Sequence, residues 1–237
     1  VKKDWIVKFC QLIIERDLEF TWQLPSGTRS EAFDDEVIDL MYKTGCRNLN
    51  FAPESGSASV LKRIKKKIDL REMKKAMKKC VSKGMIVKAN TIIGFPKETH
   101  FEIWQTLKFI AEMSWIGVHE ATIAGYVPYP GTEMYDNLRE ENKIKGFSDE
   151  YFWSMSTTSD IFNRKSHSDY VSDKFISFYS IIGVLVFYSV VFIKNPMFVF
   201  KAFYNVITGK KESSRMEATI KSILRRFNPF KVKKEYL

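Results

Sequence analysis

The fold is indicated by one stretch of sequence, Ile86–Thr99, which reads IVKANTIIGFPKET. Its first part, Ile86–Ile93, is a short apolar run rich in β-branched residues, as is typical of a buried strand. Gly94-Phe95-Pro96 then favours a tight turn, and Thr99 is a good N-cap for a helix that we expect to continue to Met113. The stretch therefore predicts a strand, a turn and a helix in direct succession.

The same alternation of strand and helix extends to both sides of this stretch. Strands are predicted at 18–24, 48–52 and 118–127, and helices at 34–44 and 69–83. Short apolar strands separated by helices imply right-handed crossovers and a parallel sheet. We therefore expect an α/β fold, either an open doubly wound sheet or part of a (β/α) barrel.

The alternation stops after residue 133, and the remaining chain is predicted to be helical. Residues 175–193 form a run of 19 residues without a charge. As a helix with a rise of about 1.5 Å per residue, this run would be about 28 Å long, close to the thickness of the hydrocarbon core of a bilayer. A basic amphipathic helix, typical of membrane surfaces, is predicted at 213–227. We therefore divide the chain into an α/β domain at 1–138 and a helical region at 139–237.

Two interpretations of the hydrophobic run at 175–193 are open. It can span the bilayer, or it can be a buried or in-plane helix that packs through a stripe of small residues, Ser177, Ser180 and Gly183. We favour membrane association over spanning, because such a stripe suits close helix packing. The positive charge of the helix at 213–227 predicts that the protein faces the cytoplasmic side.

Composition and charge exclude several classes of protein. The chain has 237 residues, of which 45% are hydrophobic, and a net charge of +10. This apolar content excludes a wholly disordered chain. The positive excess is confined to 60–83, with 11 basic and 2 acidic residues, and to 194–237, with 11 and 3, so a uniform nucleic-acid-coating charge is excluded. The lysines of Lys62–Lys79 can form a solvated helix face, which we favour, or a surface for phosphates or an anionic membrane.

The cysteines and the N-terminus add further expectations. Cys10, Cys46 and Cys80 lie 36 and 34 residues apart, too scattered for a disulfide framework or a CxxC metal site, so a reducing, cytosolic setting is expected. His119 has no second histidine near it and is assigned to packing. Residues 1–5 show neither a signal-peptide core nor an initiator Met, and we expect the chain to begin inside a larger protein.

Four loops rich in Gly, Pro and polar residues follow the predicted strands. They lie at 25–29, 53–57, 94–99 and 128–132. The carboxyl ends of parallel strands meet at one edge of a sheet or barrel, and the chemistry of α/β proteins sits at that edge. We call this edge the rim, and the four loops predict a ligand site there.

Two of the rim loops carry groups that suit a ligand. Glu54-Ser55-Gly56-Ser57 offers a carboxylate, two hydroxyls and helix N-terminal amides, which can hold the polar groups of one small ligand. Equally, Ser55 or Ser57 can simply cap the next helix. Gly94 allows close approach of a flat heterocycle, although an ordinary turn capped by Thr99 is the simpler reading. On the residues alone, both alternatives stay open.

In this order and spacing, the loops resemble the second half of the core of radical S-adenosylmethionine (radical SAM) enzymes. The resemblance is to the kind often paired with an upstream cobalamin-binding domain, and it covers residues 5–138. It rests on Arg29, Gly45-Cys46, Glu54–Ser57 with Val60-Leu61-Lys62, Ile92–Thr99 and Pro128–Thr132.

The resemblance implies a partial (β/α) barrel of six strands and a known chemistry. In that family a 4Fe-4S cluster on a CxxxCxxC loop binds the methionyl end of SAM, and one-electron reduction yields a 5′-deoxyadenosyl radical that abstracts hydrogen. Cobalamin-dependent members also transfer methyl groups. The implied cofactors are therefore SAM, the 4Fe-4S cluster and, in the methyl-transferring type, cobalamin. A substrate and a reductant for the cluster are the implied partners.

The resemblance also assigns, by position, the residues that would bind SAM. The ribose or methionyl end is assigned to Glu54, Ser55, Gly56 and Ser57; the adenine to Ile92, Gly94, Phe95 and Pro96, flanked by Tyr126 and Val127; and the methionyl carboxylate to Arg29. No catalytic residue and no metal ligand is assigned in this chain.

Two departures from the family pattern matter. The CxxxCxxC motif is absent, so this chain alone is not expected to hold the cluster or to be active. Only four of the six strands are predicted, which together with the start at Val1 indicates an N-terminally truncated fragment. Asn90 stands where the family often has Gly, which is a departure within the strand assigned to the adenine contacts.

The function predicted on this basis is that of a truncated radical SAM enzyme acting on a hydrophobic or lipid-like substrate at the cytoplasmic face of the membrane. One alternative is a non-catalytic, basic, membrane-attached binding module that uses Lys62–Lys79. Another is an RNA-modifying enzyme that resembles the methylthiotransferases. The apolar C-terminal region argues against RNA, so nucleic acid is not an expected partner.

Overall fold

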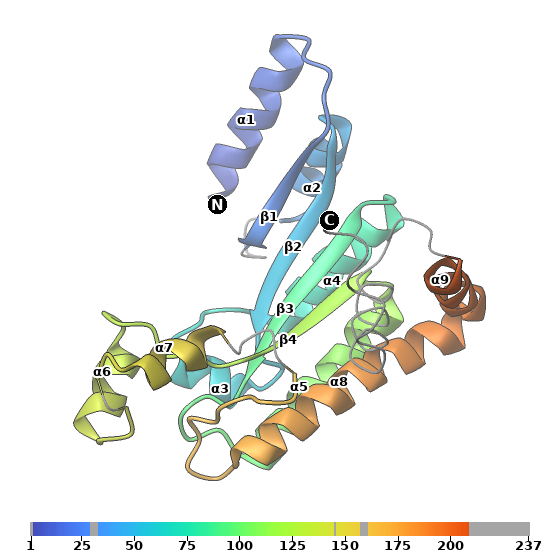
Figure 1. Cartoon of the computed structure of the whole chain (residues 1–237). Helices are drawn as coiled ribbons and strands as arrows, with labels where there is room; N and C mark the ends of the chain where they lie inside the picture. The colour runs from blue at the N-terminus through green and yellow to red at the C-terminus, as the bar shows by residue number, and fades with distance from the viewer. Residues whose placement is uncertain (1, 29–32, 145, 157–160, 209–237) are drawn as a thin grey trace, which may run out of the picture. The chain divides into compact units, whose positions relative to one another are not determined.

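The computed structural model describes residues 2–28, 33–144, 146–156 and 161–208 (Figure 1). By its internal contacts the chain separates into two units, Val1–Tyr188 and Ser189–Leu237, and each is described by itself. The boundary predicted at residue 138 lies inside the first unit. Arg29 and the helix predicted at 213–227 lie outside the described residues.

The first unit is built on four parallel strands in the order β1-β2-β3-β4. They are β1 (Trp22–Thr28), β2 (Cys46–Glu54), β3 (Ile86–Ile93) and β4 (Glu120–Gly125). The predicted parallel α/β fold is confirmed, and β3 has the predicted bounds. β1 lies farther along the chain than the predicted run at 18–24, because Thr28 still pairs with β2 and its hydroxyl donates to the carbonyl of Asn50 at 2.7 Å.

The helices that connect the strands form one layer. α2 (Asp35–Lys43) follows β1, α3 (Ala58–Arg63) and α4 (Leu70–Ser82) follow β2, and α5 (His100–Ile116) follows β3. α2 packs on α4, and α4 packs on α5. α2, α4 and α5 therefore cover a single face of the sheet, behind the strands in Figure 1.

The described part of the first unit has four further helices, and one of them, α3, is the helix that was expected to follow the loop at 53–57. α1 (Lys3–Glu15) packs on α2, α3 is the short helix after β2, and α6 (Glu133–Glu140) and α7 (Asp149–Ser156) follow β4. The helix starts that could be read from polar caps are confirmed. Asp69 accepts the backbone N–H groups of Arg71 and Glu72 at the start of α4, and Thr99 with Glu102 forms a complete capping box at the start of α5.

The two faces of the sheet differ in polarity. On the helix-covered face Leu49, Phe51 and Val87 are fully buried. On the other face the strand register places Lys88 between Asn50 and Glu120, and the Lys88 ammonium lies 3.2 Å from the Glu120 carboxylate. This ion pair is the counter-charge that a lysine within a strand requires. The half-covered polar face corresponds to the interior of a partial (β/α) barrel.

α8 (Asp173–Lys194) continues the helix layer beyond α5. A Cβ atom at Gly183 would lie 2.1 Å from Ile123 Cδ1 of β4 and 3.0 Å from Leu107 Cδ2 of α5. The hydroxyl of Ser114 donates to the carbonyl of Phe187 at 2.8 Å. Of the predicted packing stripe, Gly183 packs on β4 and α5, Ser180 is fully buried, and the hydroxyl of Ser177 accepts the N–H of Arg164. The Gly183 contact and the bond from Ser114 hold residues 173–188 against the edge of the sheet.

α8 is the one helix in the described part of the chain that is long and apolar enough to cross a membrane, although a third of its most apolar window is buried. In the second unit, α9 (Pro196–Ile207) follows the end of α8, and the rings of Phe192 and Phe200 lie 6.0 Å apart. In the described part of the second unit, large apolar side chains are exposed at Ile193, Met197, Phe200 and Ile207.

The packing of α8 gives the first prediction. In Gly183→Leu the new side chain would overlap with Ile123 and Leu107, because no space is left between the helix and these residues. Overpacking of this kind lowers the stability of a protein by about 1–3 kcal/mol. We expect that loss in the free energy of unfolding measured by urea denaturation. Leu185→Ala, at an exposed position on the same helix, is the control and should change stability by less than about 0.5 kcal/mol. Equal stability of both variants would mean that α8 does not pack on the sheet in solution.

Candidate ligand site at the carboxyl ends of the strands

The loop after β3 is held by a buried carboxylate. Glu98 Oε2 accepts the backbone N–H groups of Gly94 at 2.5 Å and Phe95 at 3.1 Å. Gly94 has a φ of +88°, a conformation that favours glycine. Glu98 thereby fixes the turn that brings the backbone of Gly94 and Phe95 to the rim.

Burial changes the protonation of this carboxylate. Glu98 is fully buried, and its Oε1 atom has no hydrogen-bond partner in the described part of the chain. Burial raises the pKa of Glu98 to about 7, although the two N–H groups that it accepts act in the opposite direction. A proton on Oε1 leaves Oε2 free to accept both N–H groups, so the protonated form suits the turn.

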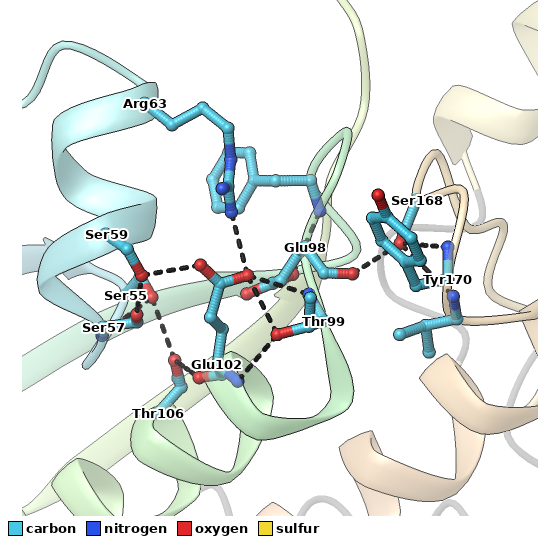
Figure 2. A network of polar contacts seen from close by, with 12 residues as sticks. Ser55, Ser57, Ser59, Arg63, Glu98, Thr99, Glu102, Thr106, Ser168 and Tyr170 are labelled. Carbon is cyan, nitrogen blue, oxygen red and sulfur yellow. Dashed lines mark hydrogen bonds and ion pairs between the residues drawn. The ribbon is translucent and has the colours of Figure 1, made fainter.

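The loop after β2 is tied to the start of α5 by a chain of hydroxyl groups (Figure 2). Ser55 Oγ lies 3.0 Å from Thr106 Oγ1, which also accepts the N–H of Gly56. Ser59 donates to Glu102 Oε1 at 2.6 Å, and Arg63 donates to Glu102 Oε2 at 2.9 Å. The network joins two rim loops into one rigid support.

The same network accounts for three of the residues predicted to bind SAM. Ser55 and Ser57 are fully buried, and the Ser55 hydroxyl accepts the N–H of Ser57 at 3.1 Å. A Cβ atom at Gly56 would lie 2.6 Å from the carbonyl oxygen of Gln105. Ser57 is the N-cap residue of α3, but its side chain makes no capping bond. In this structure Ser55 and Gly56 bind Thr106 of α5, whereas Ser57 binds Ser55 and Ser59. The contact of the three residues with SAM stays a prediction.

Glu54 differs from its neighbours because its side chain is partly exposed. It ends β2 with a φ of +61°, and its Oε1 lies 2.6 Å from the ammonium of Lys66. The carboxylate is therefore at the rim and paired with a cation. A ligand with an ammonium or hydroxyl group can bind there by replacing Lys66.

A cavity of about 420 Å³ opens at the carboxyl ends of β3 and β4. Pro96, Tyr126 and Val127, three of the residues predicted to bind SAM, line it together with Lys97 and side chains of α6. The ring of Tyr126 packs on Phe95 with centroids 4.9 Å apart, and burial raises the pKa of Tyr126 to about 12, so its phenol is neutral. The cavity is within the size range of small-molecule sites.

A segment from the C-terminal half of the first unit closes over the same loop. The N–H of His167 donates to the carbonyl of Gly94 at 3.1 Å, and the hydroxyl of Ser168 donates to the carbonyl of Glu98 at 2.5 Å. The His167 ring lies edge-on to Tyr126, and burial lowers the pKa of His167 to about 4. We call residues 164–173 the strap. It also lines a second cavity of about 460 Å³ beside His167.

The structure thus brings together part of the predicted site. Gly94, Phe95, Pro96, Tyr126 and Val127 lie at one corner of the rim, between β3 and β4. Ile92 points to the polar face of the sheet with Lys88 and Asn90, where it is half-buried. Glu54 lies at the end of the neighbouring strand.

Sequence reasoning missed Glu98, Thr106, His167 and Ser168. Glu98 and Glu102 follow Gly94-Phe95-Pro96 so closely that a buried carboxylate and a capping box could have been considered. The remaining three carry no local signal, because their partners are 50 to 73 residues distant in the sequence.

The cysteines do not fit an iron–sulfur cluster. All three are buried, and burial raises the pKa of Cys46 and of Cys80 to about 12, so their thiols are protonated. Cys46 begins β2, at the end of the strand opposite to the rim. Among the described residues there is no group of three or more potential metal ligands. We therefore assign no step to the cluster in this chain.

Two further expectations concern basic residues. The ring of His119 accepts the N–H of Val87 at 3.1 Å, so it has a structural partner, but the residue is exposed rather than packed in the core as expected. Within Lys62–Lys79, Lys66 pairs with Glu54, Lys74 with Glu112 and Lys79 with Asp39. These ion pairs favour the interpretation of the run as a solvated, charge-paired helix face.

Comparison with known proteins agrees with this fold. A family model described as the radical SAM superfamily matches residues 3–110. An uncharacterized methyltransferase of Pyrococcus horikoshii is 30% identical over 173 residues, which are 70% of this chain and 36% of the relative. The anaerobic magnesium-protoporphyrin IX monomethyl ester cyclase of Rubrivivax gelatinosus is 21% identical over 173 residues, 73% of this chain and 31% of the relative.

Among solved structures, the radical S-adenosylmethionine methyltransferase TsrM of Kitasatospora setae, with cobalamin and a 4Fe-4S cluster bound, matches with a TM-score of 0.49 and 14% identity. The match covers 62% of this chain and 29% of that one. Residues 3–110 of this chain therefore belong to the radical SAM superfamily. It spans about a third of the length of the two relatives named above.

The buried carboxylate gives the second prediction. Because the folded-state pKa of Glu98 lies above its ordinary value of about 4.3, the stability that its proton contributes is lost as the pH rises through 7. We expect the parent to lose up to about 3 kcal/mol of unfolding free energy between pH 5 and pH 8 through this group. Glu98→Gln, whose amide oxygen can accept the same N–H groups, should lack this loss in urea titrations at each pH.

The control for this titration is Glu140→Gln, which changes an exposed carboxylate on α6. It should keep the pH profile of the parent. If Glu98→Gln also kept that profile, Glu98 would not be protonated in the folded protein near neutral pH.

Proposed function

We propose that this chain is the SAM-binding part of a radical SAM enzyme of the cobalamin-associated methyltransferase type. The observation that carries the proposal is the cavity at the ends of β3 and β4, lined by Pro96, Tyr126 and Val127, in a chain of that superfamily. The similarity to a protein named a methyltransferase supports the methyl-transferring type. The cluster ligands would come from residues outside this chain.

The residues of the cavity suit the adenosyl end of SAM. Tyr126 lines the cavity and offers a ring on which a purine can stack, and the buried ring of Phe95 packs against it from behind. The buried carboxyl group of Glu98 keeps the adjoining backbone in place. Lys97 lines the cavity and has no ion pair in the described part of the chain, so it can attract a carboxylate. The strap covers the loop after β3 and limits the access of water. When bound, SAM supplies the adenosyl or methyl group that the reaction uses.

A cavity-filling variant tests this proposal. In Asn137→Trp a large ring enters the cavity from α6, whereas Asp136→Trp places the same ring at an exposed neighbouring position that does not line it. We expect saturation-transfer NMR with SAM to show contact at the adenine protons in the parent and in Asp136→Trp. The signal should fall at least about tenfold in Asn137→Trp, because the ring removes the volume that the purine needs.

Two results would contradict the proposal. One is the absence of saturation at the adenine protons of SAM in the parent chain. The other is an equal signal in Asn137→Trp and Asp136→Trp with both variants folded, which would place any SAM contact elsewhere.

We also propose a hydrophobic or lipid-like substrate and a location at the cytoplasmic face of the membrane. The support is the exposed apolar surface of the second unit, which includes Ile193, Met197 and Ile207, and the basic excess of residues 194–237. The lysines of Lys62–Lys79 have no separate role in the proposal, because several of them are paired with acidic side chains.

A further inference from the structure

α5 and α8 together expose a cluster of large aromatic side chains. Phe101 is 71% exposed and Trp104 is 52% exposed on α5, and Phe175 and Phe178 are each 49% exposed on α8. We call these four residues the aromatic face. They belong to the first unit, and none of them lines either of the two cavities described above. Contiguous exposed aromatic surface of this kind marks an interaction site.

The aromatic face is held in place by a partly buried centre. The hydroxyl of Tyr179 lies 2.8 Å from His100 Nδ1, and its ring lies 5.8 Å from Trp104 and 5.7 Å from Phe178. Phe175 packs edge-on to His100 with centroids 5.0 Å apart. Three of the four exposed rings, Trp104, Phe175 and Phe178, are therefore packed in place before any partner binds, which lowers the entropy cost of binding.

The charges around the aromatic face are positive. Lys108 lies one helical turn after Trp104, and Lys174 is adjacent to Phe175; both are exposed, and neither forms an ion pair in the described part of the chain. Two acidic residues on the same two helices, Asp173 and Glu102, have partners of their own. Asp173 accepts the N–H of Ser166 and lies 3.5 Å from Lys165, while Glu102 binds Arg63.

We infer that the aromatic face is a membrane-docking surface, which places its rings in the headgroup region of an anionic bilayer. Exposed Trp and Phe side chains flanked by lysines are the composition of helices that lie at such an interface. The chain that follows α8 continues the same chemistry, with exposed apolar side chains and a basic excess over 194–237.

The packing of α8 on the sheet indicates that this helix lies along the surface of the bilayer and does not cross it. Residues 173–188 are held to β4 and α5 through Gly183 and through the bond from Ser114 to Phe187, so a spanning orientation would expose Ile123 and Leu107 to lipid. The aromatic face instead lets α5 and α8 lie against the surface of the bilayer. The inference deepens the proposed membrane location and is independent of SAM binding, because neither helix contributes a lining residue to the 420 Å³ cavity.

Binding to vesicles tests the inference with the full chain. We expect co-sedimentation with vesicles of phosphatidylcholine and phosphatidylglycerol that persists at 0.5 M salt, since ring insertion is not screened whereas the basic residues of 194–237 are. At that salt, the double variant Phe101→Ser/Trp104→Ser should bind roughly tenfold more weakly, because two apolar side chains are removed. The matched control Trp5→Ser/Phe20→Ser removes a Trp and a Phe that are also exposed, near the β1 side of the sheet, and should bind as the parent does.

A second measurement keeps the test valid if the double variant is poorly folded. Trp104→Phe retains the aromatic surface and should bind vesicles like the parent, but quenching of tryptophan fluorescence by brominated lipid should fall. Unchanged quenching in Trp104→Phe, or equal binding of the double variant and its control, would overturn the inference. So would a stable dimer in vesicle-free solution that shields Trp104, since the face would then bind a second copy. The NMR contact between the adenine protons of SAM and the protein is measured on the same variants. Loss of vesicle binding with SAM contact retained concerns this inference alone, whereas loss of SAM contact in the parent concerns the proposed function.

Discussion

The contact between the Glu98 carboxylate and the N–H groups of Gly94 and Phe95 supports the whole rim. It lies entirely inside the protein, where an unpaired backbone N–H would cost about 1–3 kcal/mol, and it fixes a glycine at a φ that other residues rarely adopt. Tyr126 packs on Phe95, His167 donates to the carbonyl of Gly94, and Ser168 donates to that of Glu98 itself. Loosening this one turn would disturb the cavity wall and the strap together.

The strap and α8 make the C-terminal part of the first unit a component of the site. Ile176 of α8 lies against Gly94, and Arg164 of the strap lies against Gly125 at the end of β4. The helix that looks most like a membrane span is therefore packed beside the loop proposed to bind adenine. This arrangement places the aromatic face next to the rim, because α5 begins directly after the loop that Glu98 holds. In the proposed enzyme, a lipid-like substrate would be close to the bilayer and to the cavity at the same time.

The site was predicted in outline but not in its contacts. Tyr126, Val127 and Pro96 line a cavity where the loops were expected to meet, since parallel strands end at a common edge. The hydroxyls of Ser55 and Ser57 offered two interpretations, a ligand site or a helix cap. In this structure the Ser57 hydroxyl bonds to the nearby Ser59, whereas the Ser55 hydroxyl bonds to Thr106, 51 residues away on α5. A hydroxyl makes its bonds with whatever tertiary packing brings near, so its partner cannot be read from neighbours in the sequence.

The sequence by itself determined the alternation of strands and helices, the helix starts at Asp69 and Thr99, the superfamily, and the absence of the cluster motif. These depend on local propensity, on capping and on residue order, all of which are contained in short segments. Only the tertiary structure decided that Glu98 is buried, that Gly56 packs on α5, that residues 164–173 cover the rim, and that α8 packs on β4 through Gly183. Each of these depends on surfaces that come together from distant parts of the chain, where close packing and burial, rather than local preference, set the energy.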